Sequence, residues 1–381
     1  MRTQLKLETI AAQAGGTIDN DTGAIVPPIH IATTFLRDAD NQYCRGYVYG
    51  RPDNATVRQV EAVLTALEGG AASLVYGSGM AAATALFLAL PRPAHVVAPT
   101  VMYWALRKWL TADAPSCGVT ATFADTTDLD AVAAAVRPGE TRLVWLETPA
   151  NPLWTISDIA GAAGLAHASG ALLAVDSTVA TPVLTRPLTL GADVVVHAAT
   201  KYLNGHSDVV AGSLTFARRD DQFERAAGVR ASLGTILGPF EAAMLLRGMR
   251  TVYVRMRHQC ASAMAIARHF AGHPKLAEVL YPGLAGRPGH ELAARQMQGG
   301  FGGMLSIRVL GGERAAIKTA ANVEVWKRAT SLGGVESLIE HRASVEGPGS
   351  PCPPDLLRLS VGLEDVGELI TDLERAMAIR T

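Results

Sequence analysis

The sequence has few cysteines, almost no net charge and no long apolar run. Its four cysteines are far apart, without a CxxC pair or zinc-ligand spacing, so we expect free thiols and no metal site. The formal net charge is −1, which gives no electrostatic reason to bind nucleic acid or an anionic membrane. No apolar span reaches about eighteen residues, and the N-terminal residues lack the apolar core of a signal peptide. We therefore expect a cytoplasmic protein that does not enter a membrane.

Lysine is also scarce, which draws attention to one lysine. Only six of the 34 basic residues are lysines, and Lys201 lies just past the apolar run 194–196. Such a run is typical of a strand buried on both faces. Most lysines are exposed, but a lysine beyond a buried strand can be partly desolvated, which favours its neutral amine. Because a neutral amine can form a Schiff base with an aldehyde cofactor, Lys201 is a candidate catalytic residue.

A second predicted strand, at 171–177, includes Asp176 near its end, 25 positions before Lys201. A carboxylate at one strand end beside a lysine at the next suits pyridoxal phosphate. The acid keeps the pyridinium nitrogen protonated, and the lysine carries the aldehyde carbon. His197 and His206 flank the lysine, but no third ligand with suitable spacing accompanies them. We therefore expect pyridoxal phosphate and no metal.

The first 235 residues alternate predicted strands and helices after an irregular start. A strand at 72–76, a glycine turn at 77–79 and a small-residue helix can direct backbone N–H groups at a phosphate. Further strands, separated by helices, are predicted at 94–99, 119–124, 142–148, 171–177 and 194–196. This alternation predicts an α/β fold with a mainly parallel sheet, whose ligands bind at the carboxyl ends of the strands. The polar residues at those ends are Ser78, Glu147, Asn151, Asp176 and Lys201. After residue 235 we expect a long helical stretch over roughly 239–270 within a smaller α+β unit.

Eight ordered motifs resemble those of the Cys/Met-metabolism family of pyridoxal-phosphate enzymes, which includes cystathionine γ-synthases, cystathionine lyases and methionine γ-lyases. They are YGRPDN (49–54), GSGMAA (77–82), ETPANP (147–152), AVDST (174–178), HAATKYLNGHSD (197–208), LLRGMRT (245–251), SLGGVESLIEH (331–341) and LLRLSVGLED (356–365). The resemblance implies a fold type I enzyme with a seven-stranded, mainly parallel sheet. It also implies an arm at 1–55 that reaches a neighbouring subunit, a cofactor domain at 56–235 and a C-terminal α+β domain at 236–381.

The resemblance also implies roles for particular residues. Lys201 resembles the residue that bonds the cofactor and carries protons, Asp176 the partner of the pyridinium nitrogen, and Tyr103 the stacked ring. The other implied cofactor contacts are Asn151 at the cofactor hydroxyl, Gly79, Met80 and Thr200 at the phosphate, and Tyr49 and Arg51 at the phosphate of a neighbouring subunit. Ser331 and Arg358 resemble the pair that binds the substrate α-carboxylate, a role that suits a bidentate guanidinium. A homo-oligomer, as a dimer of dimers, follows from the same likeness.

Three positions depart from the family pattern. Ala198 stands two places before the Thr-Lys pair, where the family usually has a serine. Thr330 stands before Ser331, where γ-enzymes that act on cystathionine commonly carry glutamate, and the pair Trp104-Ala105 is not the Gly-Cys of methionine γ-lyases. Despite these departures, the resemblance implies an elimination or replacement at Cγ of an L-amino acid of the sulfur amino acid or homoserine type. A β-lyase and a non-catalytic cofactor-binding protein are the alternatives.

Overall fold

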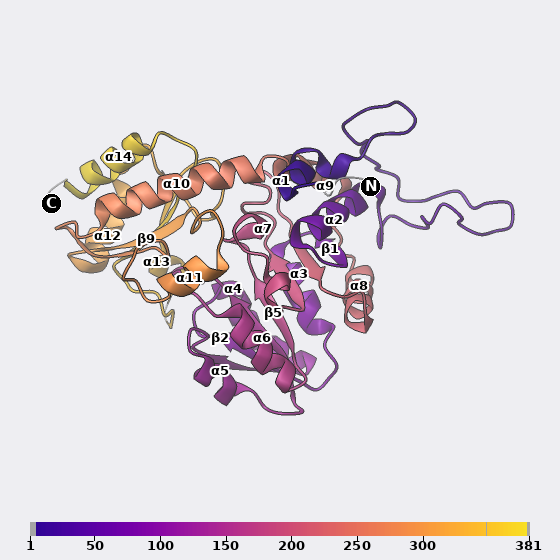
Figure 1. The fold of residues 1–381 in the computed structure, drawn as a ribbon, viewed down its shortest axis with the longest axis horizontal. Coiled ribbons are helices and arrows are strands. Elements are labelled where there is room, and N and C mark those ends of the chain that lie inside the picture. The colour runs from indigo at the N-terminus through magenta and orange to yellow at the C-terminus, as the bar shows by residue number, and fades with distance from the viewer. Residues whose placement is uncertain (1–4, 348, 379–381) are drawn as a thin grey trace.

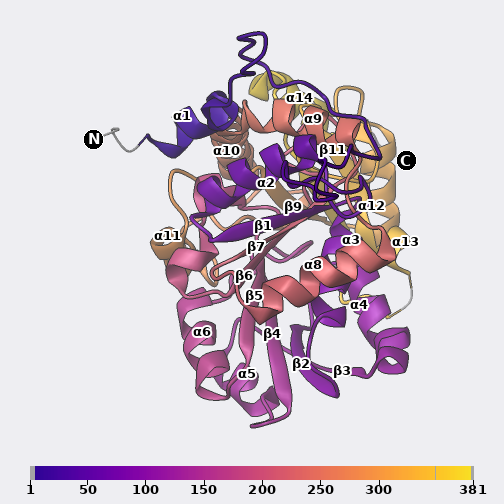
Figure 2. The ribbon, with the colours of Figure 1, turned by 90° about the vertical axis from the view of Figure 1, so that its right-hand side faces the viewer.

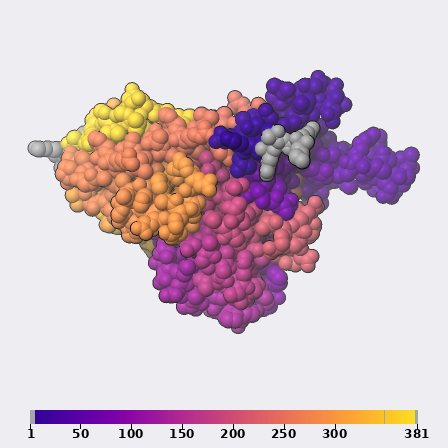
Figure 3. Space-filling view, viewed as in Figure 1, coloured from indigo at the N-terminus to yellow at the C-terminus, as the bar shows by residue number. Residues whose placement is uncertain are grey.

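The computed structural model describes residues 5–347 and 349–378, which form a large and a smaller unit (Figure 1). The segment between α1 (Leu7–Ala12) and α2 (Ala55–Glu68) projects from the body as an arm, also visible in Figure 3. The chain continues from α2 through the large unit to α8 (Asp221–Leu233). Within the described residues, no helix is both long enough and apolar enough to span a membrane.

The large unit is built on a seven-stranded sheet with the order β1-β7-β6-β5-β4-β2-β3 (Figure 2). β7 runs antiparallel to β1 and β6, and the other neighbours are parallel. The predicted mainly parallel α/β fold is therefore confirmed. The strands are β1 (Ala72–Tyr76), β2 (Ala94–Pro99), β3 (Val119–Ala124), β4 (Thr141–Glu147), β5 (Leu172–Asp176), β6 (Val194–His197) and β7 (Gly212–Phe216). The helices after α2 are α3 (Gly79–Leu88), α4 (Trp104–Ala112), α5 (Leu129–Ala135), α6 (Ile159–Ala168), α7 (Thr181–Leu184) and α8.

Helices cover both faces of this sheet, which explains the continuous apolar runs of its central strands. In β4, Leu143 and Trp145 pack in one cluster with α3, α4 and α8. The alternate residues Val144 and Leu146 pack in another cluster with α5 and α6. Because successive side chains of a strand point to opposite faces, both sets are buried. This packing holds the carboxyl ends of β4, β5 and β6 at a common edge.

The smaller unit contains a five-stranded sheet with the order β10-β11-β12-β9-β8. Its strands are β8 (Leu276–Leu280), β9 (Met304–Val309), β10 (Lys327–Arg328), β11 (Leu338–His341) and β12 (Leu356–Ser360), and its helices are α11 (His290–Gln296), α12 (Gly312–Ala321), α13 (Arg342–Glu346) and α14 (Val366–Ala378). Trp154 of the large unit donates its indole N–H to the Ser306 hydroxyl on β9 at 2.8 Å. The Ser306 hydroxyl in turn donates to the Pro152 carbonyl at 2.8 Å, so the two units are tied together beside ETPANP.

The long helical stretch predicted over roughly 239–270 is present, but it is divided into α9 (Pro239–Met249) and α10 (Val252–Phe270). Gly248 lies so close to the loop after Lys201 that a Cβ there would be 2.2 Å from the Asn204 carbonyl oxygen. The buried Arg255 guanidinium donates to the carbonyls of Gly248 at 2.8 Å and Tyr202 at 2.7 Å. The break therefore lets one arginine satisfy carbonyls of both the helix end and the loop that carries Lys201.

Candidate functional site

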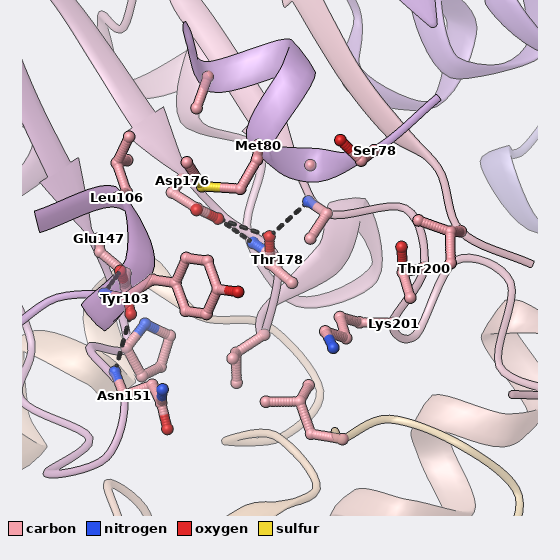
Figure 4. A pocket seen from close by; sticks show the side chains of 17 residues that line it. Ser78, Met80, Tyr103, Leu106, Glu147, Asn151, Asp176, Thr178, Thr200 and Lys201 are labelled. Atoms are coloured by element: carbon pink, nitrogen blue, oxygen red, sulfur yellow. Dashed lines mark hydrogen bonds between the residues drawn. The ribbon is translucent and has the colours of Figure 1, made fainter. Parts of the chain in front are cut away.

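A cavity of about 240 Å³ opens at the carboxyl edge of the large sheet (Figure 4). Seven of the predicted site residues line it: Gly79, Met80, Tyr103, Asn151, Asp176, Thr200 and Lys201. Ser78, Glu147 and Thr178 also line it, and the sequence analysis assigns a role to none of them. The structure thus brings together residues that lie more than a hundred positions apart in the chain.

Lys201 reaches the cavity from the turn that follows β6. Its ammonium nitrogen Nζ lies 3.0 Å from the hydroxyl of Ser331, to which it donates a hydrogen bond. Burial, followed by the nearby positive charge of Arg358, lowers the pKa of Lys201 to about 8. A substantial fraction of this amine is therefore neutral near physiological pH, and the neutral form is the nucleophile.

Asp176 and Glu147 end two neighbouring parallel strands and stand opposite each other in register. The backbone N–H and hydroxyl of Thr178 both donate to Asp176 Oδ1, at 3.0 and 2.5 Å. Burial raises the pKa of Asp176 despite these bonds. Burial, and secondly the charge of Asp176, raises the pKa of Glu147 to about 8. Because Asp176 and Glu147 are both buried and both line the cavity, they favour a cationic group of a ligand beside these strand ends.

Glu147 also positions two backbone segments at the cavity, one at Tyr103 and one at Asn151. Its carboxylate accepts the backbone N–H of Tyr103 at 2.7 Å and that of Asn151 at 2.9 Å. Tyr103 precedes α4 and is 44% exposed, and its ring stands at the cavity in Figure 4. The sequence placed Glu147 at a strand end, but spacing alone gave no sign that it orients both neighbours.

The opposite end of the cavity is formed by the start of α3. Ser78 caps this helix through its side-chain oxygen, which accepts the Ala81 N–H at 3.0 Å. A Cβ on Gly79 would lie 2.7 Å from the Cβ of Ala198, so only glycine fits there without a shift. The Thr200 hydroxyl, in contrast, is bonded to the backbone of Ala211, donating to its carbonyl and accepting its N–H at 3.0 Å each. Backbone N–H groups at a helix start suit a phosphate.

Arg358 joins the two units behind Lys201. Its guanidinium donates to Asn151 Oδ1 at 3.2 Å and to the Ser331 carbonyl at 2.9 Å. Burial lowers its pKa to about 10, which leaves it protonated at neutral pH. Ser331 has a φ of 91°, a left-handed conformation that costs a non-glycine residue roughly 1–3 kcal/mol. The bonds from Arg358 and Lys201 hold Ser331 in this conformation.

Five of the predicted site residues do not line the cavity, namely Tyr49, Arg51, Thr330, Ser331 and Arg358. Tyr49 is 48% exposed on the arm, and Arg51 donates to the Ala231 carbonyl near the end of α8. Their role at a neighbouring subunit's phosphate stays a prediction. Thr330 is exposed beside Ser331. Glu336, the acid that could stand in for a glutamate at 330, accepts a hydrogen bond from the Ser207 hydroxyl.

These residues fit pyridoxal phosphate by their chemistry. The cavity offers a partly buried amine, a buried carboxylate at a strand end, an aromatic ring, and a helix start where a Cβ has no room. Within residues 5–347 and 349–378, no group of three or more His, Cys, Asp or Glu side chains is arranged to hold a metal. His197 instead pairs with Glu68 at 2.5 Å, and both side chains are fully buried.

Comparisons with known proteins agree with this reading. The model of the family described as Cys/Met metabolism PLP-dependent enzyme matches residues 8–378. Cystathionine γ-synthase of Mycobacterium tuberculosis is 44% identical over 375 residues, covering 97% of this chain and 96% of that protein. The crystal structure of metB from Corynebacterium glutamicum superposes with a TM-score of 0.95, at 39% identity and 98% coverage of both chains. Cystathionine γ-synthase from Xanthomonas oryzae pv. oryzae, in complex with cystathionine, gives 0.94 at 36% identity, covering 99% of this chain and 98% of that one.

Proposed function

Because the chain belongs to the Cys/Met metabolism family of PLP-dependent enzymes, we propose that it catalyses γ-elimination or γ-replacement on a γ-substituted L-amino acid. The observation that carries this proposal is the placement of the Lys201 amine, which bonds Ser331 at 3.0 Å in the same cavity as Asp176. The γ-synthase relatives favour this reading over β-elimination. The family is one of enzymes, so a protein that only binds the cofactor is the poorer description.

The roles of the side chains follow from their positions. Bound pyridoxal phosphate supplies an electron-withdrawing ring that stabilises negative charge at the substrate Cα. Lys201 would hold the cofactor, and its freed amine would remove the proton at Cα and then one at Cβ, so that the γ-substituent can leave with its bonding electron pair. Asp176, whose pKa burial raises, would keep the pyridinium nitrogen protonated, because an adjacent cation favours the charged carboxylate. The Tyr103 ring covers the cofactor, and Asn151 orients its hydroxyl.

The two ends of the ligand are held by different parts of the chain. The N–H groups of Gly79 and Met80 hold the phosphate, and Tyr49 and Arg51 complete the same site in a neighbouring subunit. The Thr200 hydroxyl joins them only if it gives up its bond to the Ala211 carbonyl. Ser331 and Arg358 bind the substrate α-carboxylate. The arm exposes apolar side chains, among them Ile25 at 74% and Leu36 at 83%, and exposed apolar surface of this kind marks an interface. This surface supports a homo-oligomer, and the family resemblance adds the dimer of dimers to the proposal; a cytoplasmic location rests on the sequence alone.

The lowered pKa of Lys201 predicts how cofactor uptake depends on pH. Below about 8 the amine is protonated and unreactive, so the rate of pyridoxal-phosphate incorporation into cofactor-free protein rises with pH and levels off above about 8. Arg358→Met removes a positive charge, so it is expected to raise the apparent pKa and move the midpoint upward. Stopped-flow absorbance measures both profiles. Arg308→Met, at an ion-paired arginine on β9, is the control; a midpoint near 10 in the wild type would contradict the prediction.

Substrate choice is tested by a panel of γ-substituted amino acids. Thr330 offers no charge to the distal ammonium of cystathionine. The kcat/KM of the wild type for an activated homoserine ester, a homoserine-like compound or a thioether is therefore expected to exceed that for cystathionine by about tenfold or more. Thr330→Glu is expected to gain cystathionine turnover, and Glu336→Gln is expected to change nothing because Glu336 bonds Ser207. Release of ammonia and a 2-oxo acid separates elimination from replacement. A wild type that prefers cystathionine by a wide margin would exclude this role for Thr330.

A further inference from the structure

Arg358, which contacts the cavity residue Asn151, ends a buried chain of four alternating charges. It stands opposite Glu340 in the antiparallel register of β12 and β11. Its Nη2 lies 2.5 Å from Glu340 Oε2, and the two side chains are 4% and 8% exposed. A buried guanidinium needs such a partner, because an isolated buried charge is costly. Glu340 therefore holds Nη2 of Arg358, the same nitrogen that donates to the Ser331 carbonyl.

The same oxygen of Glu340 has a second cationic partner. Arg342 Nη1 donates to Glu340 Oε2 at 3.0 Å. Arg342 Nε and Nη2 both donate to Glu346 Oε1, at 3.0 and 2.7 Å. The side chains of Arg342 and Glu346 are 5% and 3% exposed, so water screens these charges little. From α13 to the cavity, the order is Glu346, Arg342, Glu340, Arg358, and the formal charges sum to zero.

This arrangement makes the charge at the cavity depend on a residue outside it. Without Arg342, two buried carboxylates would face the single guanidinium of Arg358, and the group would carry a formal charge of −1. That charge opposes a second carboxylate, which is what the substrate brings. Glu340 would also be free to change its contact with Arg358, whose other bonds go to Asn151 and Ser331.

We propose that Arg342 is a positioning residue for recognition of the substrate α-carboxylate. It holds Glu340 behind Arg358 and offsets the charge of Glu340, so that the guanidinium stays oriented and its positive charge stays available to the ligand. The inference rests on the proposed function of Arg358. It extends the site to α13, which the cavity does not reach.

The test compares two ligands that differ only in the carboxylate. L-alanine and ethylamine are titrated into the holoenzyme, and binding is followed by the visible absorption of the cofactor. Arg342→Met is expected to raise the Kd of alanine by about tenfold or more and to change the Kd of ethylamine by less than about twofold. Arg342→Lys, which keeps the charge, is expected to restore part of the loss. Arg308→Met, in the same sheet and paired with Asp355, is the matched control and is expected to change neither ligand.

A second variant distinguishes this function from a merely structural one. Glu346→Gln keeps an oxygen for Arg342 but leaves the group with a net positive charge, so alanine is expected to bind as tightly as in the wild type or more tightly. If the four residues only stabilise the fold, both variants weaken alanine and ethylamine alike, and the proposal is overturned. Arg358→Met separates the two levels of the argument. If Arg358→Met does not weaken alanine binding, the proposed function of Arg358 fails. If Arg358→Met weakens alanine binding while Arg342→Met has no effect on it, only the inference about Arg342 fails.

Discussion

Lys201→Ala is expected to give a folded protein that shows no visible absorption band of covalently held cofactor and no measurable turnover. The Lys201 side chain donates one hydrogen bond, to Ser331, whose carbonyl keeps its bond from Arg358 in the variant, so the fold is expected to be retained. The chemistry, in contrast, loses both its covalent anchor and its proton carrier, and we expect a fall in kcat of more than about a thousandfold. Circular dichroism and steady-state assays measure the two effects.

The control for this variant is another lysine of the same unit. Lys108 is exposed on α4, and Lys108→Ala is expected to retain both the band and the activity. Borohydride reduction of the wild-type holoenzyme, followed by digestion and mass spectrometry, is expected to locate the cofactor on the peptide that contains Lys201. Turnover at the wild-type rate in Lys201→Ala, or a label on a different lysine, would exclude the assigned anchor.

The sequence could predict this end of the site because local rules determine it. Apolar runs of four to six residues indicate strands buried on both faces, and a parallel sheet gathers their carboxyl ends at one edge. Asp176 and Lys201 are therefore brought together by the order of elements, as the register of β5 and β6 shows. The fit of Gly79 against Ala198 was not readable in this way, because it depends on the separation of two segments that are distant in the chain.

Contacts that depend on the smaller unit were harder to predict from the sequence. The pairing of Glu340 with Arg358 depends on the register of β11 and β12, and no spacing in the sequence specifies that register. The break between α9 and α10 was missed for a similar reason. Helical periodicity continues across it, but Arg255 and the loop at Tyr202 determine where the helix ends. Tertiary contacts override local propensity at both places.

Mixing two inactive variants is expected to restore activity if subunits share their sites. Arg51→Ala lacks the arm residue assigned to the neighbour's phosphate, and Lys201→Ala lacks the anchor. In a hybrid dimer, one site combines an intact Lys201 with an intact Arg51, and the other site lacks both. Random exchange of equal amounts makes half of the dimers hybrid, so about a quarter of the wild-type activity is expected for two-fold symmetric dimers.

Exchange itself is followed with two affinity tags, so that hybrids can be isolated and assayed. Arg45→Ala, at another exposed arginine of the arm, is the matched control and is expected to remain active alone. If the isolated hybrid is as inactive as its parents, Arg51 does not act across an interface, and its bond to the Ala231 carbonyl is its structural role instead. Recovery in the hybrid has no explanation within a single chain, because neither chain carries both residues. The arm would then be part of the active site of the partner, which accounts for its exposed apolar side chains and for its projection from the body of the molecule.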